Sequence, residues 1–195
     1  MQKAALILEG GAKRGVFTSG VLDYLMEQEY YIPHVIGVSA GSCNAVDYVS
    51  RQPGRTKACM IRSGEDGKII NFHNFFQTKS LLDMDLIFER DPKELHPFDF
   101  DTYFASDMTC EIVVTNCESG QAEYYSEKED GDRLMQLCRA SSSMPPVTPM
   151  VENDGVPYLD GCIADSIPLI HSMRSGYRNN APILTSNKGY RKTIS

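Results

Sequence analysis

Short apolar runs alternate with amphipathic stretches in the N-terminal part of the chain. Residues 4–8 (AALIL) form a continuous apolar run that stops at two glycines, which is typical of a short buried strand. Residues 14–28 repeat apolar side chains at helical spacing. The predicted apolar face of this helix comprises Val16, Phe17, Gly20, Val21, Tyr24 and Leu25. A strand over 34–39 and a helix over 40–51 repeat this order, so the pattern predicts an α/β protein.

The pattern is less regular between residues 56 and 106, where aromatic residues, charges and proline turns are mixed. We expect irregular structure with short helices there. Residues 110–116 (CEIVVTN) and 121–127 (QAEYYSE) are rich in β-formers on either side of a Gly-containing turn, which predicts an antiparallel hairpin. The central sheet should therefore be mixed.

The last third of the chain returns to alternating elements. Residues 131–140 place Leu134, Leu137 and Cys138 on one helical face, whereas three prolines make 141–150 a loop. A short helix over 167–175 is expected to end at Gly176, and residues 181–186 (APILTS) predict a final buried strand.

Composition limits the classes of partner and compartment. The chain has 195 residues with 42% apolar content, which fits a single domain over 1–195. The formal charge of −7 argues against nucleic acid. Six cysteines without CxxC spacing indicate a reduced, cytoplasmic protein. Because no apolar run is long enough for a signal peptide or a membrane span, a lipid substrate would be met from the aqueous side.

The pentapeptide GVSAG at residues 37–41 fits the GxSxG nucleophile elbow. Ser39 lies between a predicted strand and a predicted helix, and Gly37 and Gly41 leave room where the two elements pass closely. The helix start would also direct its N–H groups toward an oxyanion. The alternative is that Ser39 belongs to a packed turn with no chemical role.

The glycine-rich segment EGGAKRG at residues 9–15 also joins a strand to a helix. A phosphate-binding P-loop would need Ser or Thr directly after a lysine, and a dinucleotide fingerprint would need glycine in place of Ala12. An oxyanion loop, with the amides of Gly11 and Ala12 facing the elbow, is the interpretation that also uses Ser39. A simple glycine turn is the remaining alternative.

Two residues are candidates for the general base that a serine nucleophile needs. His171 follows Asp160 in the chain order expected for a Ser-Asp-His triad, but it lies in a helix-like run. Asp160 ends a short apolar run before a glycine, so we place it at a strand end, where α/β folds build their sites. Asp160 is the preferred candidate, although an isolated Asp-Gly pair is usually a turn.

In this order, the glycine loop, the elbow and the Asp-Gly pair resemble the patatin-like phospholipases, especially their bacterial branch. The stretches FTSGVLDYL and RASSSMPP are also similar to family sequences, so the resemblance covers nearly the whole chain. It implies a three-layer α/β/α fold with a mostly parallel, mixed central sheet. It also implies that relatives continue past the position of Ser195, so the C-terminal end of the domain and part of the acyl pocket are expected outside this chain.

The resemblance assigns roles residue by residue. Ser39 would be the nucleophile and Asp160 its general base, which leaves His171 without a catalytic role, and Arg14 would steady the oxyanion loop. The implied oxyanion-hole segment comprises Gly10, Gly11, Ala12, Lys13, Arg14 and Gly15. Two residues depart from the family pattern: Ala12 replaces a glycine, and Cys162 replaces a small residue after Asp-Gly. No metal or organic cofactor is implied.

The expected function is therefore hydrolysis of lipid acyl esters, with phospholipase A or lysophospholipase character, through a Ser-Asp dyad and an acyl-enzyme. The expected partners are an acyl-ester substrate and, transiently, a membrane surface. Residues 72–76 and 81–88 supply apolar side chains for an acyl channel or for the core. The alternatives are a thioesterase or general esterase with a Ser39-Asp160-His171 triad, and a catalytically silent lipid-binding protein.

Overall fold

Two strand-helix units begin the fold and position the elbow. The computed structural model describes residues 3–61, 80 and 82–190. Strand β1 (Ala4–Leu8) leads through the short 3-10 helix η1 (Ala12–Arg14) into α1 (Gly15–Glu27), and β2 (His34–Val38) leads directly into α2 (Ala40–Val49). The residues of β2 are all buried, as in parallel strands that are covered on both faces. Both predicted units are confirmed.

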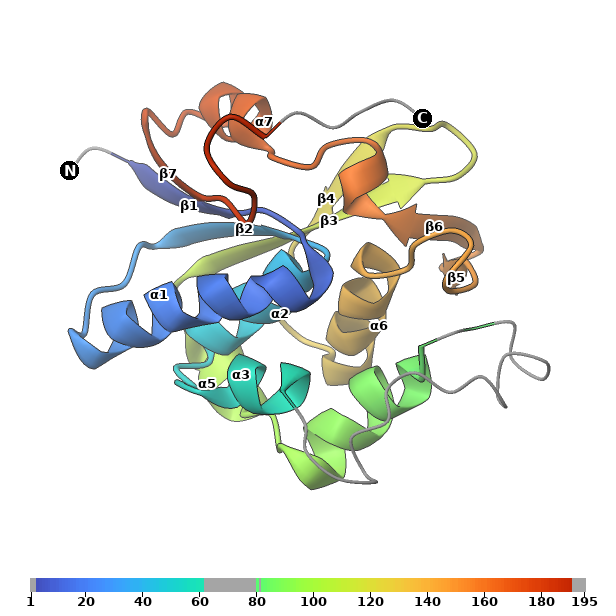
Figure 1. The fold of residues 1–195 in the computed structure, drawn as a ribbon, viewed down its shortest axis with the longest axis horizontal. Helices are drawn as coiled ribbons and strands as arrows, with labels where there is room; N and C mark the ends of the chain where they lie inside the picture. The colour runs from blue at the N-terminus through green and yellow to red at the C-terminus, as the bar shows by residue number, and fades with distance from the viewer. Residues whose placement is uncertain (1–2, 62–79, 81, 191–195) are drawn as a thin grey trace.

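A seven-stranded mixed sheet forms the centre of the protein (Figure 1). Its other strands are β3 (Thr109–Asn116), β4 (Ala122–Tyr125), β5 (Val151–Asn153), β6 (Val156–Asp160) and β7 (Asn179–Ile183). Strands β7, β1, β2 and β3 pair in parallel in that order. Strands β4 and β6 pair antiparallel with β3, and β5 pairs antiparallel with β6. The predicted hairpin of β3 and β4 is therefore confirmed.

The pairing of β3 brings two distant strand ends together. Strand β4 occupies one edge of β3 over Ile112 to Thr115, so β2 and β6, which overlap it in register, both lie along the other edge. On that edge Val38 of β2 is opposite Val113, and Asp160 of β6 is opposite Val114. The two strands consequently meet end to end, each finishing at the same point of the sheet.

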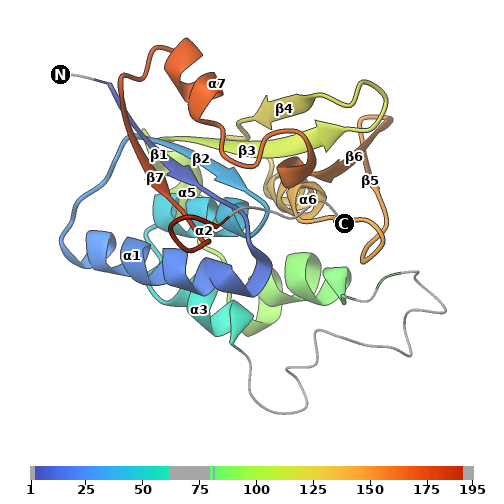
Figure 2. The same cartoon turned by 45° about the horizontal axis from the view of Figure 1, so that its top comes forward.

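The fold has three layers, because helices lie on both sides of the central sheet (Figures 1 and 2). The other helices of the described residues are α3 (Arg55–Met60), the π-helix η3 (Leu86–Leu95), α5 (Phe100–Ala105), α6 (Gly131–Ser141), the 3-10 helix η4 (Gly161–Ile163) and α7 (Leu169–Arg174). Helices α1, α2, α3 and α6 lie on one side of the sheet and α7 on the other (Figures 1 and 2). The main core lies beneath the first group and includes Leu8, Tyr48, Ile112 and Leu134.

The structure corrects the predicted face of α1. Its buried side is formed by Gly15, Thr18, Ser19, Leu22 and Met26, whereas the predicted Phe17 and Tyr24 are exposed. Small residues face inward because α1 packs closely on α2: a Cβ added at Gly15 would lie 3.0 Å from the Cβ of Ala40. The face predicted from apolar periodicity was wrong, because the buried face of α1 consists partly of small and polar side chains.

The final strand differs in position and burial from its prediction. Strand β7 begins at Asn179, two residues before the predicted start, and Asn179, Ala181 and Pro182 are exposed. It lies at the edge of the sheet with β1 as its strand partner, and this position leaves it open to solvent. Of the irregular middle, residues 62–79 and 81 lie outside the described residues, and the rest forms the expected short helices.

Candidate active site

Ser39 lies in the turn between β2 and α2 with an unusual backbone. Its φ of 56° and ψ of −126° fall outside the regions that non-glycine residues prefer. The Ser39 amide donates a hydrogen bond of 2.9 Å to Ser141 Oγ, which in turn donates to the Val113 carbonyl at 2.6 Å. This chain of bonds ties the strained turn to α6 and β3.

The two glycines flanking Ser39 sit where other backbone passes closely. A Cβ at Gly37 would collide with the carbonyl of Gly41, and a Cβ at Gly41 would collide with the carbonyl of Leu8 at the end of β1. Both contacts are with backbone atoms, which cannot swing aside as a side chain would. The sharp strand-to-helix turn therefore requires glycine at both positions.

The end-to-end meeting of β2 and β6 places Asp160 beside Ser39. The hydroxyl of Ser39 donates a hydrogen bond of 2.7 Å to Asp160 Oδ2, and the Cys162 amide donates one of 2.8 Å to Oδ1. The backbone of Asp160 is held by Thr115 and Ser143, through bonds of 2.8 and 2.7 Å. Ser39 is 7% exposed and Asp160 is 1% exposed. The hydroxyl and the carboxylate thus form a fixed, almost dry pair.

Burial raises the pKa of the Asp160 carboxyl above its ordinary value, while hydrogen bonds from Cys162 and Ser39 oppose the rise. Desolvation has this effect because it penalises the charged form of an acid. A carboxylate with a raised pKa is a stronger base than an exposed aspartate. It is therefore better matched to accepting a proton from a hydroxyl.

The glycine-rich loop lies beside the elbow. A Cβ at Gly10 would lie 2.9 Å from the Ser39 Cβ, and Ala12 and Lys13 line the same cavity as Ser39. Ala12 has a φ of 49°, so the residue that departs from the family glycine adopts a left-handed conformation. The Arg14 side chain packs over Gly11, with Nε 3.2 Å from where a Cβ would be, and Gly15 begins α1 against α2.

Thr185, just after β7, fixes this loop from the other side. Its hydroxyl donates to the Gly10 carbonyl at 2.6 Å, and its amide donates to the Glu9 carboxylate. Sequence patterns gave no sign of this role, nor of the Ser141 bond to the elbow. Both residues were visible only as parts of a predicted strand and a predicted loop, because hydroxyl groups carry no periodic signal.

His171 lies in a different cluster. Its Nε2 contacts Glu111 Oε2 at 2.7 Å, and its ring stacks on Tyr124 with centroids 3.5 Å apart. Tyr124 in turn donates to Asp165 at 2.7 Å. Among the described residues, the hydrogen-bond partners of the Ser39 and Asp160 side chains include no histidine. The structure therefore brings Ser39 and Asp160 together and leaves His171 with Glu111.

A cavity of about 400 Å³ opens beside Ser39 between α2, α3, η3 and α6. Its apolar lining includes Val46, Met60, Leu82, Met84, Ile87, Phe88 and Met135. Part of the 81–88 segment thus lines this cavity, whereas residues 72–76 lie outside the described residues. Polar side chains, including Asp47, Arg55 and Asp91, complete the wall.

The comparisons identify the family of this α/β protein. The sequence model described as patatin-like phospholipase matches residues 6–172, so the chain belongs to the patatin-like phospholipase family. The resemblance predicted from the three motifs is thus confirmed at the level of the family.

Two individual proteins are similar to the chain. The uncharacterized protein YjjU of Escherichia coli (strain K12) is 28% identical over 188 residues, which cover 94% of this chain and 52% of YjjU. The chain therefore spans about half the length of this curated relative. The crystal structure of VipD from Legionella pneumophila has a TM-score of 0.47 and 16% identity, covering 84% of this chain and 46% of VipD.

Proposed function

We propose that the protein is a serine acyl hydrolase that cleaves lipid acyl esters through a Ser39-Asp160 dyad. The observation that carries this proposal is the 2.7 Å hydrogen bond from Ser39 Oγ to Asp160 Oδ2 at the edge of a largely apolar cavity. Membership of a family of lipid acyl hydrolases supports the same chemistry. The proposed substrate is an ester whose acyl chain enters the cavity. Phospholipids, lysophospholipids and simple esters all meet this description.

The proposed reaction has two halves. Ser39 Oγ attacks the ester carbonyl while its proton passes to Asp160, and the amides of Gly11 and Ala12 stabilise the oxyanion. The tetrahedral intermediate collapses, Asp160 returns the proton to the leaving alcohol, and an acyl-enzyme remains. Water then attacks the acyl-enzyme as Asp160 accepts its proton, and collapse releases the fatty acid and returns the proton to Ser39.

Exposed apolar side chains bear on how the protein meets a lipid substrate. Among the described residues, no helix has the length and apolar character needed to cross a bilayer. Ile163, on η4 just after Asp160, is nevertheless exposed. This apolar side chain supports the proposal that the protein meets its lipid substrate by transient contact with a membrane surface.

A Ser-Asp-His triad is the competing mechanism, and the pH dependence of hydrolysis separates the two. We expect wild-type protein to hydrolyse p-nitrophenyl esters of fatty acids. Because Asp160 must be deprotonated, kcat/KM should fall as pH falls through the raised pKa of Asp160, above the ordinary value of 3.8.

The fall of kcat/KM at low pH, the acid limb of the pH profile, is tested with the His171→Ala variant. His171 contacts Glu111 and Tyr124, so its removal should leave both the rate and the midpoint of the limb nearly unchanged. Loss of the limb or of most activity in His171→Ala would support the triad instead. A complete absence of ester hydrolysis by folded wild-type protein would favour the silent lipid-binding alternative.

A further inference from the structure

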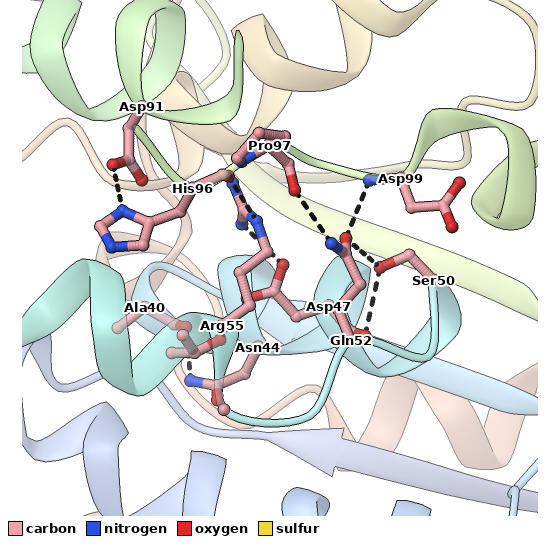
Figure 3. Close-up of polar contacts among 12 residues, drawn as sticks. Ala40, Asn44, Asp47, Ser50, Gln52, Arg55, Asp91, His96, Pro97 and Asp99 are labelled. Atoms are coloured by element: carbon pink, nitrogen blue, oxygen red, sulfur yellow. Dashed lines mark hydrogen bonds and ion pairs between the residues drawn. The ribbon is translucent and has the colours of Figure 1, made fainter. Parts of the chain in front are cut away.

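Three potential metal ligands lie close together where α3 and η3 border the cavity. Cys59 lies on α3, Asp91 lies within η3, and His96 follows the end of η3. One ligand atom from each lies within 4.8 Å of the other two. Asp91 is buried, Cys59 and His96 are partly buried, and Cys59 and Asp91 line the cavity. Figure 3 shows the side chains of Asp91 and His96 facing each other.

The chemistry of this donor set suits a particular class of ion. A thiolate, an imidazole and a carboxylate are the three side-chain ligands that zinc uses, and three protein ligands leave a fourth position for water. Calcium and magnesium prefer oxygen ligands alone, so a sulfur donor disfavours them. We propose that Cys59, Asp91 and His96 bind a zinc ion.

The Asp91 carboxylate already gathers the other two donors. Its Oδ1 contacts His96 Nδ1 at 2.7 Å, and the Cys59 thiol is hydrogen-bonded to the same side chain. A bound ion would lie between the three side chains and replace the hydrogen bonds that Asp91 now makes with His96 and Cys59. On binding, the Cys59 S–H bond breaks, the sulfur coordinates the zinc ion, and the proton leaves to solvent. The hydrogen between His96 and Asp91 also leaves that contact, and the neutral imidazole keeps its N–H on the ring nitrogen that does not bind zinc.

The surrounding charges leave room for a dication. Asp47 is neutralised by Arg55, whose Nη1 lies 2.8 Å from Asp47 Oδ1, and it also accepts a hydrogen bond from Thr56. Of the two carboxylates that line the cavity, Asp47 is thus paired with Arg55, and Asp91 is the one that contacts His96. Zinc with one thiolate, one carboxylate and a neutral imidazole is electrically neutral, which is the arrangement that a poorly solvated site favours.

The backbone around His96 is held in place. The His96 amide donates to the Asp91 carbonyl at 2.9 Å, and Arg55 Nε donates to the His96 carbonyl at 3.0 Å (Figure 3). These bonds hold the backbone of His96 and so fix the position from which its imidazole extends. The ion would therefore join α3 to η3, two elements that line the acyl cavity, and stabilise that wall.

A cysteine nucleophile is the main alternative use of these residues. In such a site the imidazole faces the sulfur and removes its proton. Here the thiol is hydrogen-bonded to Asp91, and the His96 ring nitrogen Nδ1 contacts the same carboxylate. This arrangement converges three donors on one point and favours coordination over nucleophilic attack.

Cobalt titration tests the site directly, with Co²⁺ as the probe. Reduced, metal-free protein comprising the 195-residue chain should bind one Co²⁺ per chain and develop the near-ultraviolet charge-transfer band that reports a thiolate ligand. Zinc should displace the cobalt and abolish the band. Zinc should also raise the melting temperature of the wild-type protein, because it binds the folded state.

Variants assign the ligands. Cys59→Ser should lose the band, and His96→Gln and Asp91→Asn should weaken cobalt binding at least tenfold. Cys43→Ser is the matched control, since Cys43 lines the same cavity outside the cluster, and it should keep the band.

Two results would overturn the site: no thiolate band in folded wild-type protein, or a band that persists in Cys59→Ser. If Cys59→Ser is not folded by circular dichroism, Asp91→Asn and His96→Gln decide by the same criterion of lost affinity. All titrations are repeated in the Ser39→Ala variant, which lacks the proposed nucleophile. Metal binding is thereby measured independently of ester hydrolysis.

Discussion

Replacing Asp160 by asparagine is expected to lower kcat/KM for ester hydrolysis by a factor of about 10³ to 10⁴. Asparagine keeps the shape of the side chain and can still accept from the Cys162 amide, but it cannot take the Ser39 proton. Initial rates with a p-nitrophenyl ester measure the effect.

The same variant should be at least as stable as the wild type. Because burial raises the pKa of Asp160, the ionised carboxylate costs free energy in the folded state at pH values above that raised pKa. Asparagine carries no charge, so the melting temperature at neutral pH should equal or exceed that of the wild type. A catalytic loss without a loss of stability would separate chemistry from folding.

Asp165→Asn is the matched control for Asp160→Asn. Asp165 follows on the same segment and accepts a hydrogen bond from Tyr124, away from Ser39. Its replacement should change kcat/KM by less than about twofold, which is small against the factor of about 10³ to 10⁴ expected for Asp160→Asn. Equal losses in the two variants, or full activity in Asp160→Asn, would contradict the dyad.

Replacing Gly41 by alanine is expected to destabilise the fold by about 3 kcal/mol or more. The added methyl group would collide with the Leu8 carbonyl, so β1 and α2 would have to separate at the point where they support Ser39. Urea unfolding followed by circular dichroism should show a midpoint far below that of the wild type, and activity should fall with it.

Gly20→Ala provides the comparison. Gly20 lies on the exposed side of α1, and a Cβ added there has no atom within 4 Å. Alanine in a helix is more favourable than glycine by up to about 1 kcal/mol, so this variant should match or exceed the wild-type midpoint. If Gly41→Ala unfolded at the same urea concentration as Gly20→Ala, the tight elbow would be disproved.

Local patterns were sufficient to predict the elements around the elbow. The apolar runs at 4–8 and 34–38 are strands, and the glycines after them mark the turns into α1 and α2. The hairpin of β3 and β4 was equally visible, because alternation and turn residues act over short distances. The family was recognised from three short motifs in a fixed order, and the family comparison agrees.

Contacts between distant residues were not predictable in the same way. The hydrogen bond between Ser39 and Asp160 depends on the pairing register of β2 and β6 along β3, which no local pattern encodes. The buried face of α1 was missed because close packing selects Gly15 and Ser19 in place of large apolar side chains. Cys59, Asp91 and His96 gave no metal-binding signal, because folding alone brings α3 against η3.

Covalent labelling tests the proposal that Ser39 is the nucleophile. Folded protein is treated with a fluorophosphonate, and the adduct is located by mass spectrometry of the peptides, with Ser39→Ala as the control. We expect one adduct on Ser39, none on the nearby Ser42, and loss of labelling in Ser39→Ala. An unlabelled Ser39 in folded protein, or an adduct that persists in Ser39→Ala, would contradict it.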